Sequence, residues 1–464
     1  MTASHKTDFL GRDAIFPLLL KMGIPAAVGM MVNALYNVVD TIFVGHGVGP
    51  LAIAALSIVF PIQMIVSSFA QALSFGTASI VSRKLGEKRV EEAAQAMGTA
   101  YAAVAVITAV VVALVFLFMR PVLSVFGASA TIMPYAEEYL TVVNAGFFFF
   151  AMSMCASNLV RSEGNARASM TGMIVGAGLN TVLDPLFIFG FGMGIRGAAI
   201  ATVISQMASC LYLFSLYFRG KGHVPLTMKH IRVRWNLLGQ SALLGIPSFV
   251  QNAGMSLLAL IINNSLGFYG GDEAITMYGM NHKINSIVIM PVIGIVQGFQ
   301  PIAGYNYGAR QFRRVRQSLR TALLTAFVVA CAGYAFMMLA PRTAMGMFTS
   351  DADLIAKSAR ALRIMVLLVP MAAVQITSST YFQAIGKATQ AFILGVSRQF
   401  LILIPLVLVL PSFFGVDGVW ASFPLADGIS TVIGVILLVL SVRHLEADAK
   451  IHPVSGDADG QAEE

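Results

Sequence analysis

Long apolar runs recur along the whole of this 464-residue chain, and they constrain its fold more than any other feature. Charged residues make up only 11% of the sequence, against about 25% in soluble globular proteins, so these runs cannot all be buried core helices. Polarity does not alternate at every second residue, as a transmembrane barrel would require. The sequence therefore predicts an all-α polytopic membrane protein and excludes soluble, fibrous and disordered classes.

Twelve of the runs are long enough to cross about 30 Å of hydrocarbon. They lie near residues 14–45, 51–82, 94–119, 132–158, 168–190, 195–218, 236–268, 275–306, 317–340, 354–382, 388–413 and 417–441. Several exceed the roughly 20 residues that a straight crossing needs, which predicts tilted or projecting helices.

Basic residues are distributed unevenly among the loops between these runs. Most of the 30 Lys and Arg lie at the N-terminus, in the even-numbered loops and in the C-terminal tail. Only Arg120, Arg196 and Arg342 lie in the odd-numbered loops. This bias predicts that both termini are cytoplasmic. It also explains the basic clusters without a nucleic-acid partner. The N-terminus lacks a cleavable signal pattern, so we expect the first span to remain as an anchor.

The chain is internally duplicated at an offset of 222 residues. Pro25 coincides with Pro247, and Gly164 coincides with Gly386 without an intervening gap. Each copy holds six spans, so both enter the membrane in the same sense and are related by a pseudo-two-fold axis along the membrane normal. The sequence thus predicts two six-helix lobes.

This duplication sets the expected domain boundaries. The N-lobe covers residues 1–219, a basic cytoplasmic linker covers 220–235, and the C-lobe covers 236–445. The acidic tail at 446–464 has no apolar face to bury, so we expect it to be disordered.

Polar side chains within the predicted spans are the candidate functional residues, because a charge in hydrocarbon is costly and rarely retained without a role. Asp40 lies roughly five residues from the outer end of the first span. Tyr36 lies one turn earlier on the same helical face. A carboxylate at a helix mouth with no further role is the alternative interpretation of Asp40.

A second group of polar residues lies at a similar depth in three other spans. Asn180 and Asp184 are four residues apart on one face of the fifth span, about 9 Å deep for Asp184 at 1.5 Å per residue. Tyr139 in the fourth span and Thr202 in the sixth lie at a comparable level. Their oxygens can share a proton or bind a small hard cation. The expected ion- or proton-binding residues are Asp40, Asp184, Asn180, Tyr139 and Thr202, and the candidate Na⁺ ligands are Asp40, Asn180, Asp184 and Thr202.

The duplication supplies a control for this prediction, because residues needed only for the shared fold tend to occur in both copies. Asp40 maps onto Ile262, and Tyr139 maps onto Ala361. The acidic chemistry is therefore expected in the N-lobe alone.

Four further residues are secondary candidates for lining the substrate path or for gating: Tyr36, Pro25, Lys283 and Glu163. Pro25 is expected to kink the first span. Lys283 either repels cationic substrates or acts as a snorkelling or paired structural cation. Glu163 lies between two arginines at a cytoplasmic helix end, where a local salt-bridge cap is the simpler interpretation and a gating role the alternative.

Four sequence segments together resemble the multidrug and toxic compound extrusion (MATE) transporters of the MOP fold. They are YNVVDTIFVG at 36–45, RSEGNA at 161–166, LNTVLDPLFIFG at 179–190 and GFQPIAGYNYGA at 298–309. The similarity covers about residues 14–441, and the placement of acids is similar to the DinF-like or MepA-like bacterial branch. That branch implies cation or proton binding at the five residues above. In the NorM-like branch, acids in the seventh and tenth spans carry coupling, and these spans lack such carboxylates here.

The resemblance and the residues together predict a secondary antiporter. It is expected to export amphipathic, often cationic compounds in exchange for H⁺ or Na⁺, by rocker-switch alternating access of two lobes. A phosphate-binding GxxxxGK[ST] loop is absent, so we expect neither ATP hydrolysis nor another enzymatic activity, and no cofactor. The expected partners are small amphipathic molecules and the lipid bilayer, with the protein acting as a monomer.

Two alternative functions remain open from the sequence. A flippase for lipid-linked sugars has a similar architecture, but it is expected to need a more cationic cavity. An intramembrane aspartyl protease could use two membrane aspartates as an acid/base dyad. However, Asp184 lies in an LDP setting rather than in the Gly-x-Gly-Asp setting of those proteases.

Overall fold

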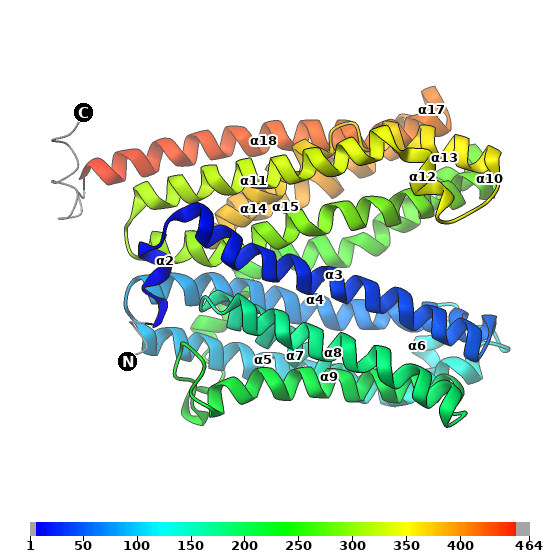
Figure 1. Cartoon of the computed structure of the whole chain (residues 1–464), viewed down its shortest axis with the longest axis horizontal. Helices are drawn as coiled ribbons and strands as arrows, with labels where there is room; N and C mark the ends of the chain where they lie inside the picture. The colour runs from blue at the N-terminus through cyan, green and yellow to red at the C-terminus, as the bar shows by residue number, and fades with distance from the viewer. Residues whose placement is uncertain (1–5, 452–464) are drawn as a thin grey trace. The chain divides into compact units, whose positions relative to one another are not determined.

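The computed structural model of this chain is almost entirely helical and describes residues 6–451 (Figure 1). Its first half contains α2 (Phe9–Arg12), α3 (Ile15–Gly47), α4 (Pro50–Gly86), α5 (Val90–Leu117), α6 (Met119–Val125), α7 (Met133–Ser162), α8 (Ala166–Pro185), the π-helix η1 (Leu186–Gly190) and α9 (Gly194–Phe218).

The second half begins with the 3₁₀-helix η2 (Met228–His230) and the long helix α10 (Trp235–Gly308). It continues with α11 (Phe312–Leu339), α12 (Pro341–Gly346), α13 (Ala352–Met365), α14 (Val369–Ala384), α15 (Ala388–Val396), the π-helix η3 (Ser397–Leu403), α16 (Ile404–Val409), α17 (Pro411–Phe414) and α18 (Val416–Ile451).

These helices account for the twelve predicted spans. Within the described residues, ten helices are long and apolar enough to cross a membrane, and α13 with α14 forms an eleventh candidate that bends by 47°. The 74-residue α10 covers two predicted spans, because its backbone leaves helical geometry at Gly271, where φ is 65°. The all-α polytopic fold class is confirmed, and the tenth span is a broken helix rather than a straight one.

The duplication is visible in the backbone as well as in the sequence. Lys88 and its counterpart Arg310 both adopt left-handed φ values, of 63° and 57°, which non-glycine residues seldom do. Gly164 and Gly386 likewise have φ values of 91° and 83°. The two copies therefore end corresponding helices with the same turns.

The chain divides into two compact units. Among the described residues, the first unit comprises 25–81 and 90–253, and the second comprises 6–24, 82–89 and 254–451. The linker at 220–235 lies wholly within the first unit. The chain instead passes between units within α3 at Pro25, within α4 after Val81, between α4 and α5 after Arg89, and within α10 at Gly254. Each unit thus includes helix ends from the other half of the sequence.

Glycines explain how these exchanged helix ends pack. In the first unit, a Cβ on Gly76 of α4 would lie 1.9 Å from the carbonyl oxygen of Ser241 in α10. In the second unit, a Cβ on Gly298 of α10 would lie 2.5 Å from the backbone nitrogen of Gly23 in α3. Gly76 and Gly298 are counterparts at the 222-residue offset, so one close helix crossing is used once in each unit.

The C-terminal helix extends further than the sequence predicted. The backbone of α18 continues through Ile451 and takes in the first residues of the segment at 446–464 for which we expected disorder. The remainder of that segment, 452–464, lies outside the described residues.

Candidate ion-binding site

The structure brings the five predicted site residues together in the first unit. Asp40 lies on α3, Tyr139 on α7 and Thr202 on α9, while Asn180 and Asp184 lie on α8. Asn180 Nδ2 donates a hydrogen bond to Asp184 Oδ1 at 3.1 Å, as their four-residue spacing predicts. Both side chains are buried, with exposures of 1% and 0%. The expected clustering of these residues is therefore present in the fold.

Two close contacts hold α3 against the α8 segment on either side of Asp40. A Cβ on Gly29 would lie 2.8 Å from the sulfur of Met173 in α8. A Cβ on Gly47 would lie 2.2 Å from Ile188 in η1, the π-helical turn that follows Pro185. Because glycine presents no side chain at these positions, the two helices approach closely enough to place Asp40 beside Asp184.

The carboxyl groups of Asp40 and Asp184 lie close enough to interact directly. Both are acceptors when ionised, so a hydrogen bond between them requires a proton. Asp40 Oδ1, Asp184 Oδ2 and Asn180 Oδ1 are buried and have no hydrogen-bond partner among the described residues. Buried polar atoms in native proteins nearly always have a partner. The pair thus has open acceptor positions for a proton or a small cation.

Two tyrosines surround this pair of acids. Tyr36 on α3 and Tyr139 on α7 lie within electrostatic reach of both Asp40 and Asp184. Tyr139 also lies near the Thr202 hydroxyl. Two carboxyls, an amide and hydroxyl groups are ligands typical of a hard cation. The described residues contain no cluster of three His, Cys, Asp or Glu side chains suited to a transition metal.

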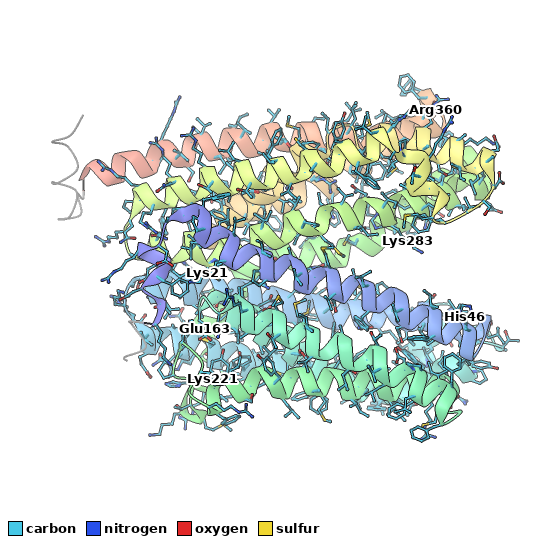
Figure 2. All side chains as sticks on the ribbon, viewed as in Figure 1. Lys21, His46, Glu163, Lys221, Lys283 and Arg360 are labelled. Carbon is cyan, nitrogen blue, oxygen red and sulfur yellow. The ribbon has the colours of Figure 1, made fainter. Side chains whose placement is uncertain are left out.

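Two secondary candidates lie apart from this cluster. Lys283 is an exposed residue on α10 in the second unit, and it forms no ion pair with any residue in the described range (Figure 2). Pro25 lies inside α3 at the point where that helix passes from one unit to the other. Pro25 can therefore influence the acids only through the direction of α3.

Glu163 anchors the linker to the first unit. It caps the C-terminus of α7, is 0% exposed, and its Oε2 accepts a hydrogen bond from the backbone nitrogen of Val224 at 2.8 Å. His223 Nδ1 lies 2.8 Å from the Glu163 carbonyl oxygen. Glu163 lies near Lys221, at the end of the first unit opposite His46 (Figure 2). We call these two ends of the unit the Glu163 end and the His46 end.

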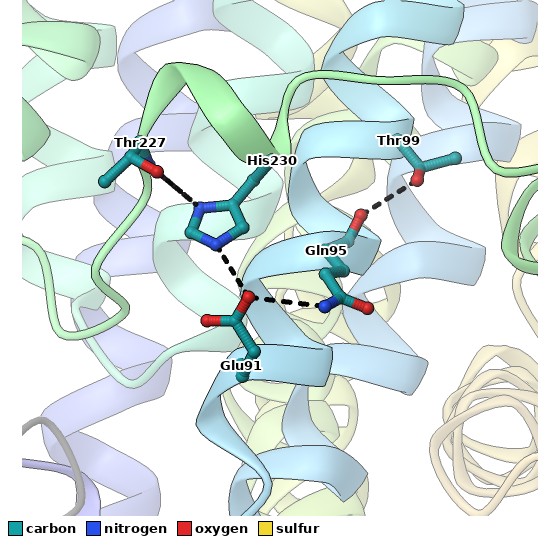
Figure 3. Close-up of polar contacts among 5 residues, drawn as sticks. All are labelled: Glu91, Gln95, Thr99, Thr227 and His230. Carbon is teal, nitrogen blue, oxygen red and sulfur yellow. Dashed lines mark hydrogen bonds and ion pairs between the residues drawn. The ribbon is translucent and has the colours of Figure 1, made fainter.

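A second contact pins the linker to α5 (Figure 3). His230 Nε2 lies 3.0 Å from Glu91 Oε1, and Thr99 Oγ1 donates to the carbonyl oxygen of Arg232 at 3.1 Å. A Cβ on Gly98 would lie 2.1 Å from the His230 carbonyl oxygen, so only glycine allows this approach. The linker is therefore a docked segment rather than a free tether, which its basic composition alone did not indicate.

The sequence analysis also missed a buried ion pair in the second unit. Arg398 of η3 donates from Nε to Asp427 Oδ1 of α18 at 2.5 Å, and the Asp427 side chain is 3% exposed. Two opposite charges in the eleventh and twelfth spans were the available signal. Their pairing is not periodic in sequence, because it depends on how two spans pack.

The fold and the site therefore define a class of protein: a membrane protein of twelve spans in two duplicated halves, with an acid pair in one half. Comparison with known proteins gives the same class. The profile of the MatE family matches residues 25–186 and 247–409, which are the two copies of the duplication. The chain belongs to the MatE family.

Relatives and solved structures agree along nearly the whole chain. The multidrug export protein MepA of Staphylococcus aureus (strain MSSA476) is 22% identical over 440 residues, covering 95% of this chain and 97% of the relative. The protein of the same name from Staphylococcus haemolyticus (strain JCSC1435) is 23% identical over 437 residues, covering 94% and 96%. A solved structure described as an outward-facing multidrug resistance MATE family transporter of the MOP superfamily matches with a TM-score of 0.89 and 26% identity, covering 95% of this chain and 99% of that one.

Proposed function

We propose that this protein is a secondary multidrug antiporter, which exports amphipathic, often cationic compounds in exchange for H⁺ or Na⁺. The observation that carries the proposal is the Asp40–Asp184 pair, which is buried in the first unit with open acceptor positions. The relatives named multidrug export proteins support the substrate class. Under this proposal, the protein is a transporter and not an enzyme.

Ion binding at the acid pair can change the conformation of the protein. When both carboxyls are ionised they repel each other across the α3–α8 contact, and the repulsion is strong in an apolar surrounding. A proton or Na⁺ between them replaces that repulsion with a bridge. Since α3 continues past Pro25 into the second unit, ion binding can bias the balance between outward-open and inward-open states. This is rocker-switch alternating access coupled to an ion.

We favour H⁺ as the coupling ion, with Na⁺ as the alternative. Burial and a neighbouring acid both favour the neutral form of a carboxyl group, so one proton per pair is readily retained. Na⁺ would compete for the same oxygens of Asp40, Asn180, Asp184 and Thr202. We further propose that the protein acts as a monomer in a bacterial inner membrane, with both termini in the cytoplasm.

Export from proteoliposomes under separately imposed pH and Na⁺ gradients tests the function. We expect gradient-driven export of a fluorescent organic cation by the wild-type protein. Asp40→Asn and Asp184→Asn should each abolish it while the protein still inserts, and Asp40→Asn should affect substrate binding less than transport. Asp353→Asn, at an exposed acid on α13, is the matched control and should export normally. Full export by the doubly neutralised Asp40→Asn, Asp184→Asn protein would contradict the mechanism.

A further inference from the structure

Beyond the acid pair, α8 and α9 of the first unit turn small and polar faces toward each other. On α9, polar residues recur at helical spacing as Thr202, Ser205, Gln206 and Ser209. Ser209 Oγ donates a hydrogen bond to the Gly172 carbonyl oxygen of α8 at 2.8 Å. This polar face of α9 therefore starts beside the acid pair and runs along α8 toward the Glu163 end.

Helix α7 completes this polar seam from the other side. A Cβ on Gly146 would lie 3.3 Å from Gln206 Oε1, so the amide of Gln206 points toward α7. The hydroxyl oxygens of Ser153 on α7 and Ser209 on α9 lie 2.8 Å apart. We use the term polar seam for these side chains of α7, α8 and α9 between Asp184 and Ser209.

Several atoms of the polar seam lack any partner within the described part of the chain. Thr202 and Ser205 are 6% and 3% exposed, yet neither hydroxyl has a hydrogen-bond partner there. The same holds for both amide atoms of Gln206. Each such group costs about 1–3 kcal/mol when left unpaired. Buried polar groups that the protein does not satisfy are typically satisfied by internal water.

A second group of unpartnered hydroxyls lies further along α9. The hydroxyls of Tyr101 on α5 and Tyr217 on α9 are buried and lie near each other, and neither has a partner within hydrogen-bond distance among the described residues. Both lie within electrostatic reach of Glu163. Tyr217 follows Ser209 by eight residues, or about 12 Å along a helix axis. Buried polar groups without a hydrogen-bond partner thus occur along α9 as far as the Glu163 end, where the linker docks.

One apolar step separates these two groups. Leu213 is 0% exposed, and a Cβ on Gly172 would lie 2.8 Å from its side chain. A continuous water file would conduct protons down their gradient without substrate. An apolar interruption at Leu213 is therefore what a carrier requires, and a channel does not.

We infer that the polar seam holds internal water and is the route by which the proton of the Asp40–Asp184 pair leaves toward the Glu163 end. The inference rests on the proposed antiport function. The O–H bond of the protonated carboxyl breaks as a water of the seam accepts the proton. Water and the serine hydroxyls each accept one proton and donate another as far as Leu213. When a conformational change moves Leu213 aside, water connects them to the tyrosine hydroxyls, and the excess proton reaches solvent at the Glu163 end. The proton and the substrate then follow separate paths through the protein.

Radiolytic hydroxyl-radical footprinting tests the water directly in the wild-type protein. Radicals form from water next to the labelled side chain, so a buried residue reacts only where water is held. Cys155 and Cys210, which lie within reach of Tyr101 beside the seam, should be labelled in a dose-dependent manner. Met345, 0% exposed in the apolar core of the second unit, is the control and should stay unlabelled. Labelling of these cysteines no faster than of Met345 would overturn the hydrated seam.

Transport variants test the proton route. The double change Ser205→Ala, Gln206→Leu removes the unpartnered groups of Ser205 and Gln206, and it should slow pH-driven export at least about tenfold, with equilibrium substrate binding unchanged. Ser215→Ala is the matched control on α9, because its hydroxyl already donates to the Tyr212 carbonyl oxygen at 2.7 Å. It should export at the wild-type rate. Retaining the hydroxyl with Ser205→Thr in place of Ser205→Ala should restore part of the rate.

The outcomes separate this inference from the proposed function. Absence of export under both a pH gradient and a Na⁺ gradient in the wild-type protein would overturn the function itself. Export driven by a Na⁺ gradient alone would leave the function standing and overturn the proton route. Normal pH-driven export by the wild type and by the Ser205→Ala, Gln206→Leu variant would overturn the proton route alone. A loss of substrate binding equal to the loss of export would identify the seam as a substrate contact and would also overturn the route.

Discussion

At the scale of single residues, Asn180 and Asp184 show how a short spacing becomes a site. Their four-residue separation closes one hydrogen bond on α8 and leaves one oxygen of each side chain unpartnered among the described residues. The second acid, Asp40, comes from a distant helix. The pair can therefore retain one proton, since burial and a like charge both disfavour ionisation of the second carboxyl.

Asn180→Leu removes the amide donor to Asp184 while keeping the volume similar. We expect ion-driven export to fall strongly and the protein to lose about 1–3 kcal/mol of stability, because the buried carboxyl of Asp184 loses the hydrogen bond that Asn180 donates to it. Proteoliposome export and thermal unfolding in detergent measure the two effects. Asn236→Leu, at an exposed position of α10, should change neither. Normal export by Asn180→Leu would remove Asn180 from the site.

Asp8 provides a residue-scale prediction of pH dependence outside the membrane. It forms an ion pair with Lys88, and the hydrogen bond from Lys88 holds the pKa of Asp8 below its ordinary value. A lowered pKa means that the pair stabilises the fold above the ordinary pKa of about 3.9 and is lost as pH falls below it. Protection of the α2 amides from hydrogen exchange, taken relative to the intrinsic exchange rate at each pH, should fall at low pH, and Asp8→Asn should lower it already at pH 7. Equal exchange in both proteins at pH 7 would contradict this role.

At the scale of elements, the contacts that hold helices and linker in place depend on glycines and on pairs far apart in sequence. Gly98 of α5 admits the linker backbone, and Glu91 and Glu163 bind it at two points. In the second unit, η3 and α18 are joined by the Arg398–Asp427 pair. These contacts decide which parts of each unit move together.

Gly98→Ala should displace the linker from α5, because the added Cβ would meet the His230 carbonyl oxygen at 2.1 Å. We expect faster proteolytic cleavage within residues 219–234 than in the wild type. Gly178→Ala on α8 is the matched control, since a Cβ there meets no atom within 4 Å. That change should leave cleavage unchanged and slightly favour the helix, by about 1 kcal/mol or less. Unchanged cleavage in Gly98→Ala would show that the linker is not held there.

Asp427→Asn should destabilise the protein by about 1–3 kcal/mol, because Arg398, whose side chain is 27% exposed, would keep its charge without its carboxylate partner. The double change Arg398→Met, Asp427→Leu should cost less, since no unpaired charge remains. Thermal unfolding in one detergent compares the three proteins. If the double variant is less stable than Asp427→Asn, the ion pair stabilises the protein more than apolar side chains do at the same two positions.

At the scale of the whole molecule, the duplication gives two units that share one backbone pattern but differ in chemistry. The acid pair and the polar seam lie in the first unit, whereas the Arg398–Asp427 pair lies in the second. The chain passes between units within three helices and once more in the turn between α4 and α5. A rearrangement of the units would therefore be transmitted through α3, α4, α10 and that turn rather than through the docked linker.

Topology reporters test the expected orientation of the whole chain. A reporter that is active only in the periplasm should be inactive when fused at the C-terminus and active when inserted near residue 128, in an odd-numbered loop. The reason is the bias of Lys and Arg toward the even-numbered loops and the termini. A reporter active only in the cytoplasm should give the opposite pattern at both positions. A periplasmic C-terminus would reverse the orientation.

The sequence by itself determined the spans and the duplication, and it predicted a common membrane depth for the polar residues. Apolar length, loop charge and the 222-residue offset are local or periodic signals, so counting along the chain placed Asp40, Tyr139, Asn180, Asp184 and Thr202 at one level before any fold was known.

Only the tertiary structure decided which of these residues meet and how the halves share their helices. The approach of Asp40 to Asp184 depends on Gly29 and Gly47 of α3, which let that helix lie against the α8 segment. The polar seam, the docked linker and the Arg398–Asp427 pair depend likewise on contacts between distant segments. Periodicity assigns a residue to a helix face, but the packing of side chains between helices selects the partner of that face.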